Sequence, residues 1–369
     1  MKLKKIEVGY IHIPLITPFK TALRTVDSIS DLIVKVTAED GSAGYGEAPP
    51  TAVITGDTKE SIEAAIRYYI APAILGMELE PLDAVMEKMD RAIAKNTSAK
   101  AAVDIALYDL YAKIKGQPLF RLLGEKHPEE IRTELETDLT ISVNETDEMV
   151  RDSIQAVERG FQVLKVKVGK GGEKDVERIR EIRKAVGENV LIRVDANQGW
   201  SREEAVRTIS AMEDAGLDIE LVEQPVSYHD FKGMQYVTEK VKTPILADES
   251  VFSYEDAVRI IEEHAADLIN IKLMKTGGLW QAMKICDIAD KNQVKCMIGC
   301  MLESKVSVSA GAHLGAARGC ITMADLDGPS LCSTDPYTGG PDFTGPKILL
   351  PESAGIGITG MPVKFETVG

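Results

Sequence analysis

The stretch VLKVKVGK, residues 163–170, poses the question that decides the fold. Lys165 and Lys167 stand two apart among valine and leucine residues, a pattern typical of a β-strand. Side chains two apart on a strand point to the same side, so the two lysines share a face. On a surface strand that face is simply hydrated. In a buried sheet, two neighbouring ammonium groups need anionic partners.

Seven further apolar runs of similar length surround this stretch from about residue 137 onward. The eight runs are DLTISV (138–143), VLKVKV (163–168), VLIRVDA (190–196), IELVEQP (219–225), PILADES (244–250), LINIKL (268–273), KCMIGC (295–300) and CITMADLD (320–327). Amphipathic segments such as EKDVERIREIRKAV (173–186) lie between them. The alternation predicts an α/β fold with a parallel sheet, and eight strands favour a TIM-type barrel. An open doubly wound sheet is the alternative, but GKGGEK (169–174) matches its phosphate loop poorly.

The first 130 or so residues predict a separate α+β unit. In DLIVKVTAEDGSAGYGEAPP (31–50), Asp40 and Gly41 stand between two apolar runs, which predicts a β-hairpin. Apolar residues at helical spacing over 62–70, and the alanine-rich segment 98–120, predict helices. We therefore divide the chain into an α+β unit (1–130), a barrel (131–327) and a tail (328–369) that is long enough to return to the first unit.

Charge and cysteine content exclude several classes of protein. The formal net charge of −15 argues against nucleic-acid and anionic-membrane partners. No apolar run has the roughly 18 residues of a membrane span, and the first residues lack the apolar stretch of a signal peptide, so we expect a cytoplasmic protein. The five cysteines match no zinc motif and suggest no disulfide framework. We expect them to pack as reduced, small apolar side chains.

Charged residues end the predicted strands at a regular interval. Lys167, Asp195, Glu223, Asp248, Lys272 and Asp325 follow one another at steps of about one strand-plus-helix unit, the last step spanning two. One polar strand end often serves only as a hydrated residue or a helix cap, as Ser201 does before the next helix. Six in succession indicate a site at the barrel mouth. The three consecutive carboxylates need a cation, and all-oxygen ligands favour Mg²⁺ or Mn²⁺ over zinc.

The lysines then gain a chemical role. Lys165 and Lys167 would point into the barrel mouth, and Lys272 would approach from the other side. Burial and a nearby Mg²⁺ both lower the pKa of a lysine towards that of a useful base. One lysine would remove the proton next to a metal-bound carboxylate, giving an ene-diolate. Two bases on opposite faces make a racemase or epimerase, whereas one base serves an elimination or a cycloisomerisation. We assign Lys275 to the following loop and His313 to a helix away from the ligands.

Five motifs resemble those of the enolase superfamily, in its muconate-lactonizing subgroup. They are KVK (165–167), DAN (195–197), VEQP (222–225), ADES (247–250) and NIKLMKTGG (270–278). The resemblance implies an N-terminal α+β capping domain, a modified TIM barrel of the form (β/α)₇β and a returning tail. It implies Mg²⁺ on Asp195, Glu223 and Asp248, and Lys167 and Lys272 as the two acid–base catalysts. Lys165 would pair with the substrate carboxylate.

The motifs are shared by muconate cycloisomerases, o-succinylbenzoate synthases, N-acylamino acid racemases and dipeptide epimerases. ADLDGP (324–329) carries Asp325 and Asp327 two apart, and two carboxylates suit an ammonium group, as in dipeptide epimerases. PFKTALRT (18–25) and VITGD (53–57) are similar to loops of L-Ala-D/L-Glu epimerases. By this resemblance, Arg24 would receive a glutamate side-chain carboxylate through its planar fork of donors.

The resemblance therefore implies a Mg²⁺-dependent epimerase that inverts the α-carbon of the C-terminal residue of L-Ala-L/D-Glu-type dipeptides. An N-acylamino acid racemase or o-succinylbenzoate synthase is the alternative among enzymes, and a non-catalytic small-molecule-binding barrel is the alternative of another class. A role in recycling peptidoglycan peptides is implied only by the resemblance. We also expect a homo-oligomer.

Overall fold

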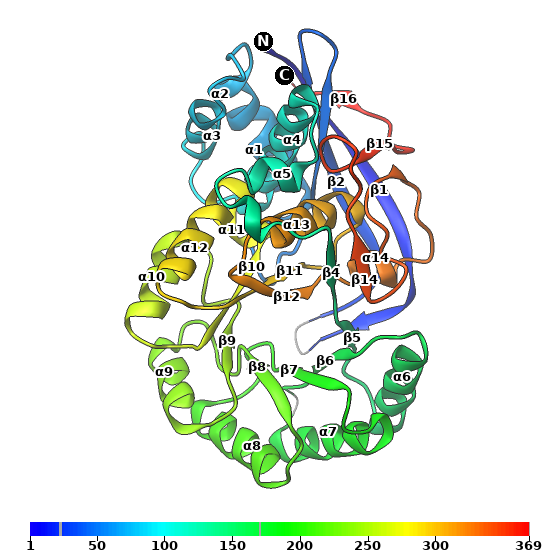
Figure 1. Ribbon diagram of the computed structural model, residues 1–369, viewed down its shortest axis with the longest axis vertical. Coiled ribbons are helices and arrows are strands. Elements are labelled where there is room, and N and C mark those ends of the chain that lie inside the picture. Colours follow the sequence, from blue (N-terminus) through cyan, green and yellow to red (C-terminus); the bar gives the residue numbers. More distant parts are fainter. Residues whose placement is uncertain (22–23, 170, 369) are drawn as a thin grey trace.

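An α+β unit lies above an eight-stranded barrel in the computed structural model, which describes residues 1–21, 24–169 and 171–368 (Figure 1). The barrel sheet is parallel throughout, with its strands in sequence order. Its members are β5 (Leu139–Ile141), β6 (Val163–Lys167), β7 (Leu191–Asp195), β8 (Ile219–Glu223), β9 (Ile245–Ala247), β10 (Leu268–Lys272), β11 (Cys296–Gly299) and β12 (Ile321–Asp325). Each falls within one predicted run. A parallel bridge between Thr137 and Ala324 joins the first edge to the last.

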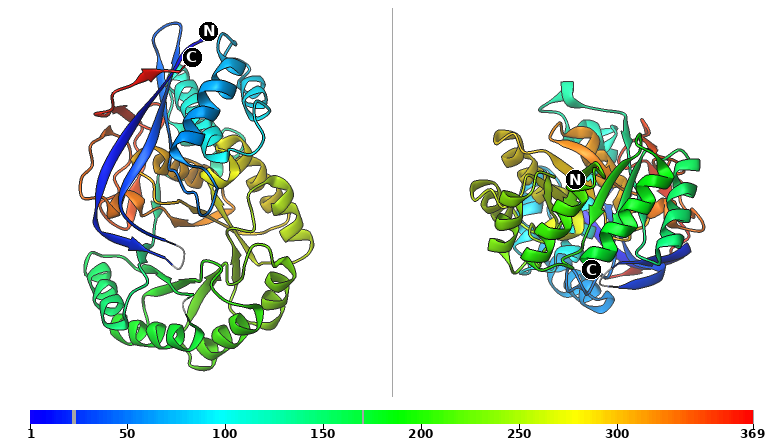
Figure 2. Two further views of the ribbon diagram at one scale, coloured as in Figure 1. Left: turned by 180° about the vertical axis from the view of Figure 1, so that it is seen from behind. Right: turned by 90° about the horizontal axis from the view of Figure 1, so that it is seen from below.

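Helices fill the seven intervals between these strands and surround the sheet (Figure 2). They are α6 (Thr146–Glu158), α7 (Gly172–Val186), α8 (Arg202–Asp214), α9 (Phe231–Lys240), α10 (Tyr254–Glu262), α12 (Leu279–Lys291) and α13 (Lys305–Ala317), with the short α11 (Leu273–Thr276) directly after β10. The predicted cap is confirmed, since Ser201 Oγ accepts from Glu204 N at the start of α8. The predicted (β/α)₇β barrel with its N-terminal α+β unit is confirmed.

The barrel interior holds a small apolar cluster, and the buried Arg193–Asp138 ion pair lies beside Met297 of that cluster. Leu221, Leu246 and Met297 are fully buried and form a small apolar cluster of their own inside the sheet. The charged residues stand at the carboxyl ends of the strands, where a TIM-type barrel carries its site. His313 lies elsewhere, buried in α13, where its Nδ1 accepts from Phe120 N, so it is no ligand at these strand ends.

The N-terminal unit is an antiparallel sheet with one long helix packed against it. The sheet runs in the order β16 (Glu366–Thr367), β1 (Leu3–Lys20), β2 (Thr25–Ala38), β3 (Ala43–Ala48), so the predicted hairpin is confirmed. Helix α4 (Thr97–Lys115) ends at Gly116, whose φ of 69° is left-handed. It lies close to β3 because Gly46 has no side chain: an added Cβ would come within 1.8 Å of the carbonyl oxygen of Ala102.

Shorter elements complete this unit. They are α1 (Lys59–Ala65), η1 (Ile66–Ile70), α2 (Ala71–Ile74), α3 (Leu82–Asp90), α5 (Leu119–Leu123) and η2 (Pro128–Glu130), and the next strand, β4 (Glu134–Glu136), pairs with β14 of the tail. The helix predicted over 62–70 is not regular, because η1 is a π-helical turn between two α-helical segments. The apolar spacing survives this change, with Ile62, Ile66 and Ile70 all fully buried.

Two segments tie the unit to the barrel. The β1–β2 ribbon runs from the top of the molecule down to the barrel (Figures 1 and 2), where Lys20 N donates to Ser142 Oγ. The tail carries α14 (Gly328–Leu331), β13 (Thr338–Gly339), β14 (Lys347–Leu349) and β15 (Ile358–Gly360) before β16 pairs with β1. The tail thus returns to the first unit. The domain limits at residues 130 and 327 stay a prediction.

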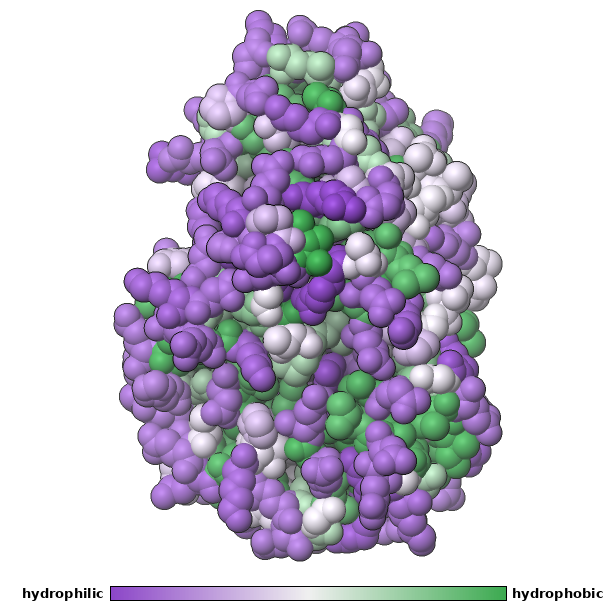
Figure 3. Space-filling model, in the orientation of Figure 1, coloured by the Kyte–Doolittle hydropathy of each residue, from purple (hydrophilic) through white to green (hydrophobic). Residues whose placement is uncertain are grey.

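The face shown in Figure 3 is covered mainly by hydrophilic residues. Among the helices of the described residues, none is long and apolar enough to cross a membrane. All five cysteines are free thiols.

Candidate active site

The strand register places the predicted site residues side by side. Lys167 on β6 is the register partner of Asp195 on β7, and Asp195 is the partner of Glu223 on β8. Asp248 follows β9, and Lys272 ends β10 on the other side. These five residues are all buried. The regular spacing read from the sequence therefore corresponds to a row of charged groups along the barrel mouth.

Lys165 has three carboxylate partners. Its Nζ lies 2.6 Å from Asp325 Oδ2, 2.7 Å from Glu223 Oε2 and 3.2 Å from Asp195 Oδ2. Only 1% of Lys165 is exposed. Burial lowers the pKa of Lys165, but Asp325, Glu223 and Asp195 outweigh it and raise that pKa overall. The strand of residues 163–167 is thus a buried one, and these carboxylates are the anions that its lysines require.

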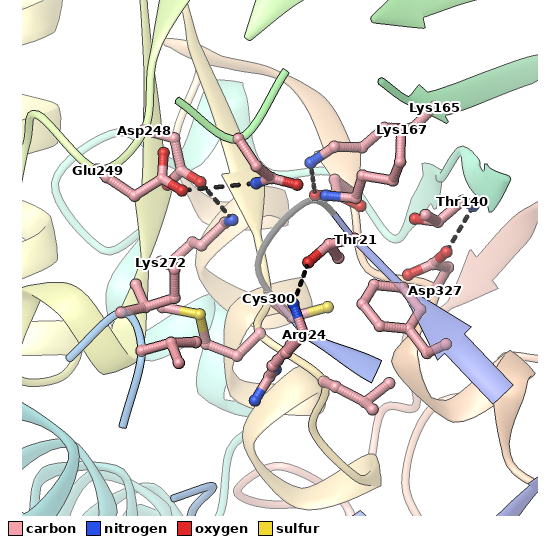
Figure 4. A pocket seen from close by; sticks show the side chains of 17 residues that line it. Thr21, Arg24, Thr140, Lys165, Lys167, Asp248, Glu249, Lys272, Cys300 and Asp327 are labelled. Carbon is pink, nitrogen blue, oxygen red and sulfur yellow. Dashed lines mark hydrogen bonds and ion pairs between the residues drawn. The ribbon is translucent and has the colours of Figure 1, made fainter. Parts of the chain in front are cut away.

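Lys167 and Lys272 face the pocket from different walls (Figure 4). Lys167 Nζ lies 2.6 Å from Asp195 Oδ2, and Lys272 Nζ lies 2.7 Å from Asp248 Oδ2. Burial lowers the pKa of Lys272, but Asp248 outweighs burial and the net pKa is raised. The direction is opposite to our expectation because that expectation included the charge of a bound cation. The Asp248 carboxylate, 2.7 Å from its Nζ, holds the proton on Lys272.

The donor set of Asp195, Glu223 and Asp248 fits a hard divalent cation. All the donors are carboxylate oxygens, the ligands that Mg²⁺ prefers. Glu223 Oε2 and Asp248 Oδ1 are buried without a hydrogen bond among the described residues and face only lysine ammonium groups. Burial and the neighbouring Asp195 raise the pKa of Glu223 to about 7. The ammonium groups of Lys165, Lys167, Lys272 and Lys275 contact these three carboxylates, and a divalent cation would take the place of part of that positive charge.

Another acidic group lies beside the predicted ligands. Within the described residues, Asp138, Asp325 and Asp327 are the buried acids whose carboxylate oxygens come within 4.8 Å of one another. Among the described residues, the carboxylate oxygens of Asp195, Glu223 and Asp248 do not all lie within 4.8 Å of one another. The Lys165 ammonium contacts both Asp195 and Glu223. A divalent cation there would compete with Lys165 for these oxygens.

Three residues for which no role at the site was predicted lie beside the metal ligands: Lys275, Asn270 and Glu249. Lys275 lies in α11, so the prediction that it belongs to a loop was wrong. Its Nζ lies 2.6 Å from Asp248 Oδ1 and donates to the Asn270 carbonyl oxygen at 2.9 Å. Asn270 Nδ2 donates to Glu223 Oε1 at 2.9 Å and orients it. Glu249 is buried next to Asp248, and burial with the Asp248 charge raises the pKa of Glu249 to about 8. No periodic signal marked Lys275, since Lys272 ends a strand and α11 is only four residues long.

One end of the pocket is acidic. Asp325 and Asp327 both line it, and Asp327 Oδ2 accepts from Thr140 N at 2.7 Å. Burial and Asp325 together raise the pKa of Asp327 to about 6, since two carboxylates repel each other there. The two aspartates are therefore brought together, as their spacing predicted, at a place suited to a cation.

Arg24 lines the same pocket as these aspartates and the lysines (Figure 4). Its backbone N–H donates to Thr21 Oγ1, whereas Ala22 and Leu23 of the predicted loop lie outside the described residues. Burial lowers the pKa of Arg24. Among the residues that the structure describes, no carboxylate lies within ion-pair distance of its guanidinium. Apolar side chains complete the pocket wall: Phe19, Val53, Ile54, Met301 and Leu302.

Comparison with known proteins places this site in a family. Residues 5–124 match the mandelate racemase / muconate lactonizing enzyme N-terminal domain, and residues 148–362 match the enolase C-terminal domain-like family. The L-Ala-D/L-Glu epimerase of Clostridium acetobutylicum is 52% identical, over 98% of this chain and 99% of the relative.

Two solved structures have the same fold over nearly their whole length. A substrate-liganded complex of the L-Ala-D/L-Glu epimerase from Bacillus subtilis is 48% identical with a TM-score of 0.95, covering 98% of this chain and 99% of that one. A dipeptide epimerase from Enterococcus faecalis, complexed with Mg and L-Leu-L-Tyr, is 41% identical with a TM-score of 0.93, covering 98% and 100%. The chain therefore belongs to the enolase superfamily, as a member of its mandelate racemase and muconate lactonizing enzyme family.

Proposed function

We propose that this protein is a Mg²⁺-dependent epimerase of L-Ala-Glu-type dipeptides, inverting the α-carbon of their C-terminal residue. One observation carries the proposal: a single pocket has lysines on two walls, a pair of aspartates and an arginine. Three relatives that are 41% to 52% identical over nearly the whole chain are named L-Ala-D/L-Glu epimerase or hydrophobic dipeptide epimerase, which supports the same reaction, whereas an N-succinyl-L-Arg/Lys racemase is 33% identical.

Lys167 and Lys272 are the proposed proton carriers. Because they come from β6 and β10, one can take the α-proton from one face while the other returns a proton to the opposite face. Asp195 and Asp248 hold the two ammonium groups in place. Asp195, Glu223 and Asp248 would hold Mg²⁺, whose positive charge would acidify the proton on the substrate carbon next to a nearby carboxylate.

The remaining charged groups suit a dipeptide zwitterion with an acidic side chain. Asp325 and Asp327 would bind the free ammonium, Lys165 the α-carboxylate, and Arg24 the glutamate carboxylate. A half-buried guanidinium without a carboxylate partner, as Arg24 is among the described residues, favours an anionic ligand group. An N-acylamino acid or o-succinylbenzoate precursor has no ammonium to set against two buried aspartates, so those reactions are disfavoured.

Several finer expectations belong to this proposal. They are Mn²⁺ as an alternative ion, the recycling of peptidoglycan peptides, a cytoplasmic location, a homo-oligomeric state, and the three-part division of the chain at residues 130 and 327. Mn²⁺ shares the preference of Mg²⁺ for carboxylate ligands.

Proton exchange at the α-carbon tests the function directly. The protein with Mg²⁺ is incubated in D₂O with a library of L-Ala-L-Xaa dipeptides, and mass spectrometry measures deuterium uptake while chiral chromatography measures the new epimer. We expect both for L-Ala-L-Glu. N-acetyl-L-Ala-L-Glu is the matched control, since it lacks only the ammonium, and it should react far more slowly. Equal turnover of the acetylated peptide would favour an N-acylamino acid racemase, and no exchange with any substrate would favour a binding protein.

A further inference from the structure

The chain turns sharply directly after Lys167, at the end of β6. Gly169 has a φ of 94°, in the left-handed region that favours glycine, and a Cβ added to it would lie 2.3 Å from the carbonyl oxygen of Ala196. Val168 N donates to the Asp195 carbonyl oxygen at 2.9 Å. The turn after Lys167 therefore packs directly against the segment that follows β7.

One buried carboxylate on α7 binds both of these segments. Asp175 Oδ2 accepts from Gly169 N at 3.0 Å and from Trp200 Nε1 at 3.1 Å, so it joins the turn after β6 to the loop after β7. Its other oxygen, Oδ1, accepts from Arg178 Nη1 at 2.7 Å. Asp175, Arg178 and Trp200 are all buried, and charge-assisted hydrogen bonds of this kind are short and strong. The Asp175 carboxylate thus fixes the end of β6 from behind.

Lys167 depends on this support more than the other lysines of the pocket do. Among the described residues, Asp195 is the one carboxylate within ion-pair distance of its Nζ. Lys165, two residues earlier on β6, is held by three carboxylates, and Lys272 is held by two. The position of Lys167 Nζ is therefore set by the backbone that carries it and by Asp195, which lies just before the loop that Asp175 also binds.

We propose that Asp175 is a positioning residue for Lys167 and serves only the half of the reaction that Lys167 performs, an inference that rests on the proposed two-base function. Lys167 lines the pocket, whereas Asp175 is not among the described residues that do, so Asp175 acts through Gly169 and Trp200. A misplacement of a reacting group by about 1 Å can cost about 10²-fold in rate. Lys272 ends β10, on another wall, so a shift at the end of β6 leaves it in place.

Proton exchange measured separately for each epimer tests the proposal. With Mg²⁺ in D₂O, Asp175→Asn should lower α-proton exchange of one epimer of Ala-Glu by a factor on the order of 10². That epimer should be the one that Lys167→Ala also fails to exchange. The other epimer, which Lys272 serves, should exchange at nearly the wild-type rate with an unchanged KM.

Mg²⁺ affinity gives a readout that does not depend on turnover. The hydrogen bonds of the Asp175 side chain go to Gly169, Trp200 and Arg178 and not to the predicted metal ligands. Calorimetry should therefore give Asp175→Asn nearly the wild-type affinity for Mg²⁺. A residue that merely stabilised the whole mouth would lower Mg²⁺ affinity and slow both epimers together.

Two further variants keep the test decisive if loss of the Arg178 partner destabilises Asp175→Asn. Trp200→Phe keeps an aromatic ring and removes only the Nε1–H donor, so it should slow the same epimer by a smaller factor. Asp267→Asn is the matched control, because Asp267 Oδ2 accepts from Ile245 N at 2.8 Å at the start of β9, away from the mouth. It should slow neither epimer selectively.

Equal slowing of both epimers by Asp175→Asn or Trp200→Phe, or a parallel loss of Mg²⁺ affinity, would overturn the proposal. Wild-type exchange of both epimers in these two variants would do the same, since Lys167 would then be held without Asp175. If the wild-type protein exchanges neither epimer, the proposed function itself has failed, and the positioning role fails with it.

Discussion

Lys275 Nζ lies 2.6 Å from Asp248 Oδ1, and both residues are buried. The other carboxylate oxygen, Oδ2, lies 2.7 Å from Lys272 Nζ. Asp248 is therefore held by two lysines, one of which faces the pocket while the other lies in α11. Lys275 also donates to the carbonyl oxygens of Asp248 and Asn270, so it fixes both the backbone and the side chain of a predicted metal ligand.

Replacing Lys275 with methionine should destabilise the protein by about 3–5 kcal/mol, because it leaves a buried carboxylate oxygen unpaired. Urea unfolding measures this loss. The exposed Lys184 gives a matched control, and Lys184→Met should change the free energy of unfolding by less than about 0.5 kcal/mol. Mg²⁺ affinity, measured by calorimetry on whatever fraction remains folded, should also fall. Equal stability of the two variants would contradict a structural role for the Lys275 ion pair.

Chelation should abolish epimerisation, and Mg²⁺ should restore it, because Asp195, Glu223 and Asp248 are the proposed Mg²⁺ ligands. Glu223→Gln removes one charge and should weaken Mg²⁺ binding by at least about tenfold in calorimetry. Glu203 is exposed on α8, so Glu203→Gln should bind Mg²⁺ like the wild type. Full turnover after exhaustive EDTA treatment would refute the metal site.

Lys167→Ala and Lys272→Ala should each stop interconversion of the epimers, with rates falling by a factor on the order of 10² or more. The remaining lysine still reaches one face of the α-carbon. Each variant should therefore exchange the α-proton of only one epimer with D₂O, and the two variants should prefer opposite epimers. If either variant still interconverts epimers at nearly the wild-type rate, the two-base mechanism is wrong.

Arg24→Ala should lower kcat/KM for L-Ala-L-Glu by a factor on the order of 10², since a charged hydrogen-bonding partner is lost. Turnover of L-Ala-L-Leu should fall much less, because it carries no side-chain charge. Arg24→Lys keeps the charge without the planar fork and should lie between the two. Equal losses of kcat/KM on both dipeptides would mean that Arg24 orders the connection between β1 and β2 and does not recognise the substrate side chain.

Asp31 predicts a pH dependence of stability. Burial and the nearby Glu47, which accepts from Ser304 N and Ser307 N at the start of α13, raise the pKa of Asp31 far above its usual range. The folded state then keeps a proton that the unfolded chain loses above about pH 4, so stability falls as pH rises, by up to about 1.4 kcal/mol per pH unit.

Asp31→Asn removes that ionisation. Urea unfolding at both pH values should therefore show that Asp31→Asn is more stable relative to the wild type at pH 7 than at pH 5. That is, the free energy of unfolding of the variant minus that of the wild type should be larger at pH 7. The exposed Asp27 lies on the same strand, and Asp27→Asn should show no such difference. A constant offset between Asp31→Asn and the wild type at the two pH values would argue that Asp31 is ionised in the folded protein.

The barrel could be predicted because its signal is repeated eight times. Each strand is indicated by its own short apolar run. A wrong assignment of the segment between two strands therefore does not change the prediction of the other strands. The polar residue that ends each strand, such as Asp195 or Glu223, inherits its position from that repeat. The roles assigned to these residues stay predictions, but their placement at one mouth follows from the period alone.

Contacts between distant segments could not be predicted in the same way. The sequence showed that Lys165 needed an anion, but Asp325 lies 160 residues away along the chain. Lys275 was misassigned because a short helix after a strand has no periodic signal of its own. Cys320 Sγ donates to the Cys286 carbonyl oxygen, which joins the start of a strand to a helix 34 residues away along the chain. In each case the partner is set by packing across the barrel and not by local propensity.

The pairing of β1 with β16 has a consequence for the protein during its synthesis. Glu7 and Val8 find their register partners in Thr367 and Glu366, which a ribosome adds only after all eight barrel strands. During synthesis of the barrel, the edge of β1 at these residues therefore has no β16 to pair with, and its backbone groups stay unpaired. We expect nascent chains halted before residue 366 to need a chaperone for that edge, and to become resistant to proteases only after release.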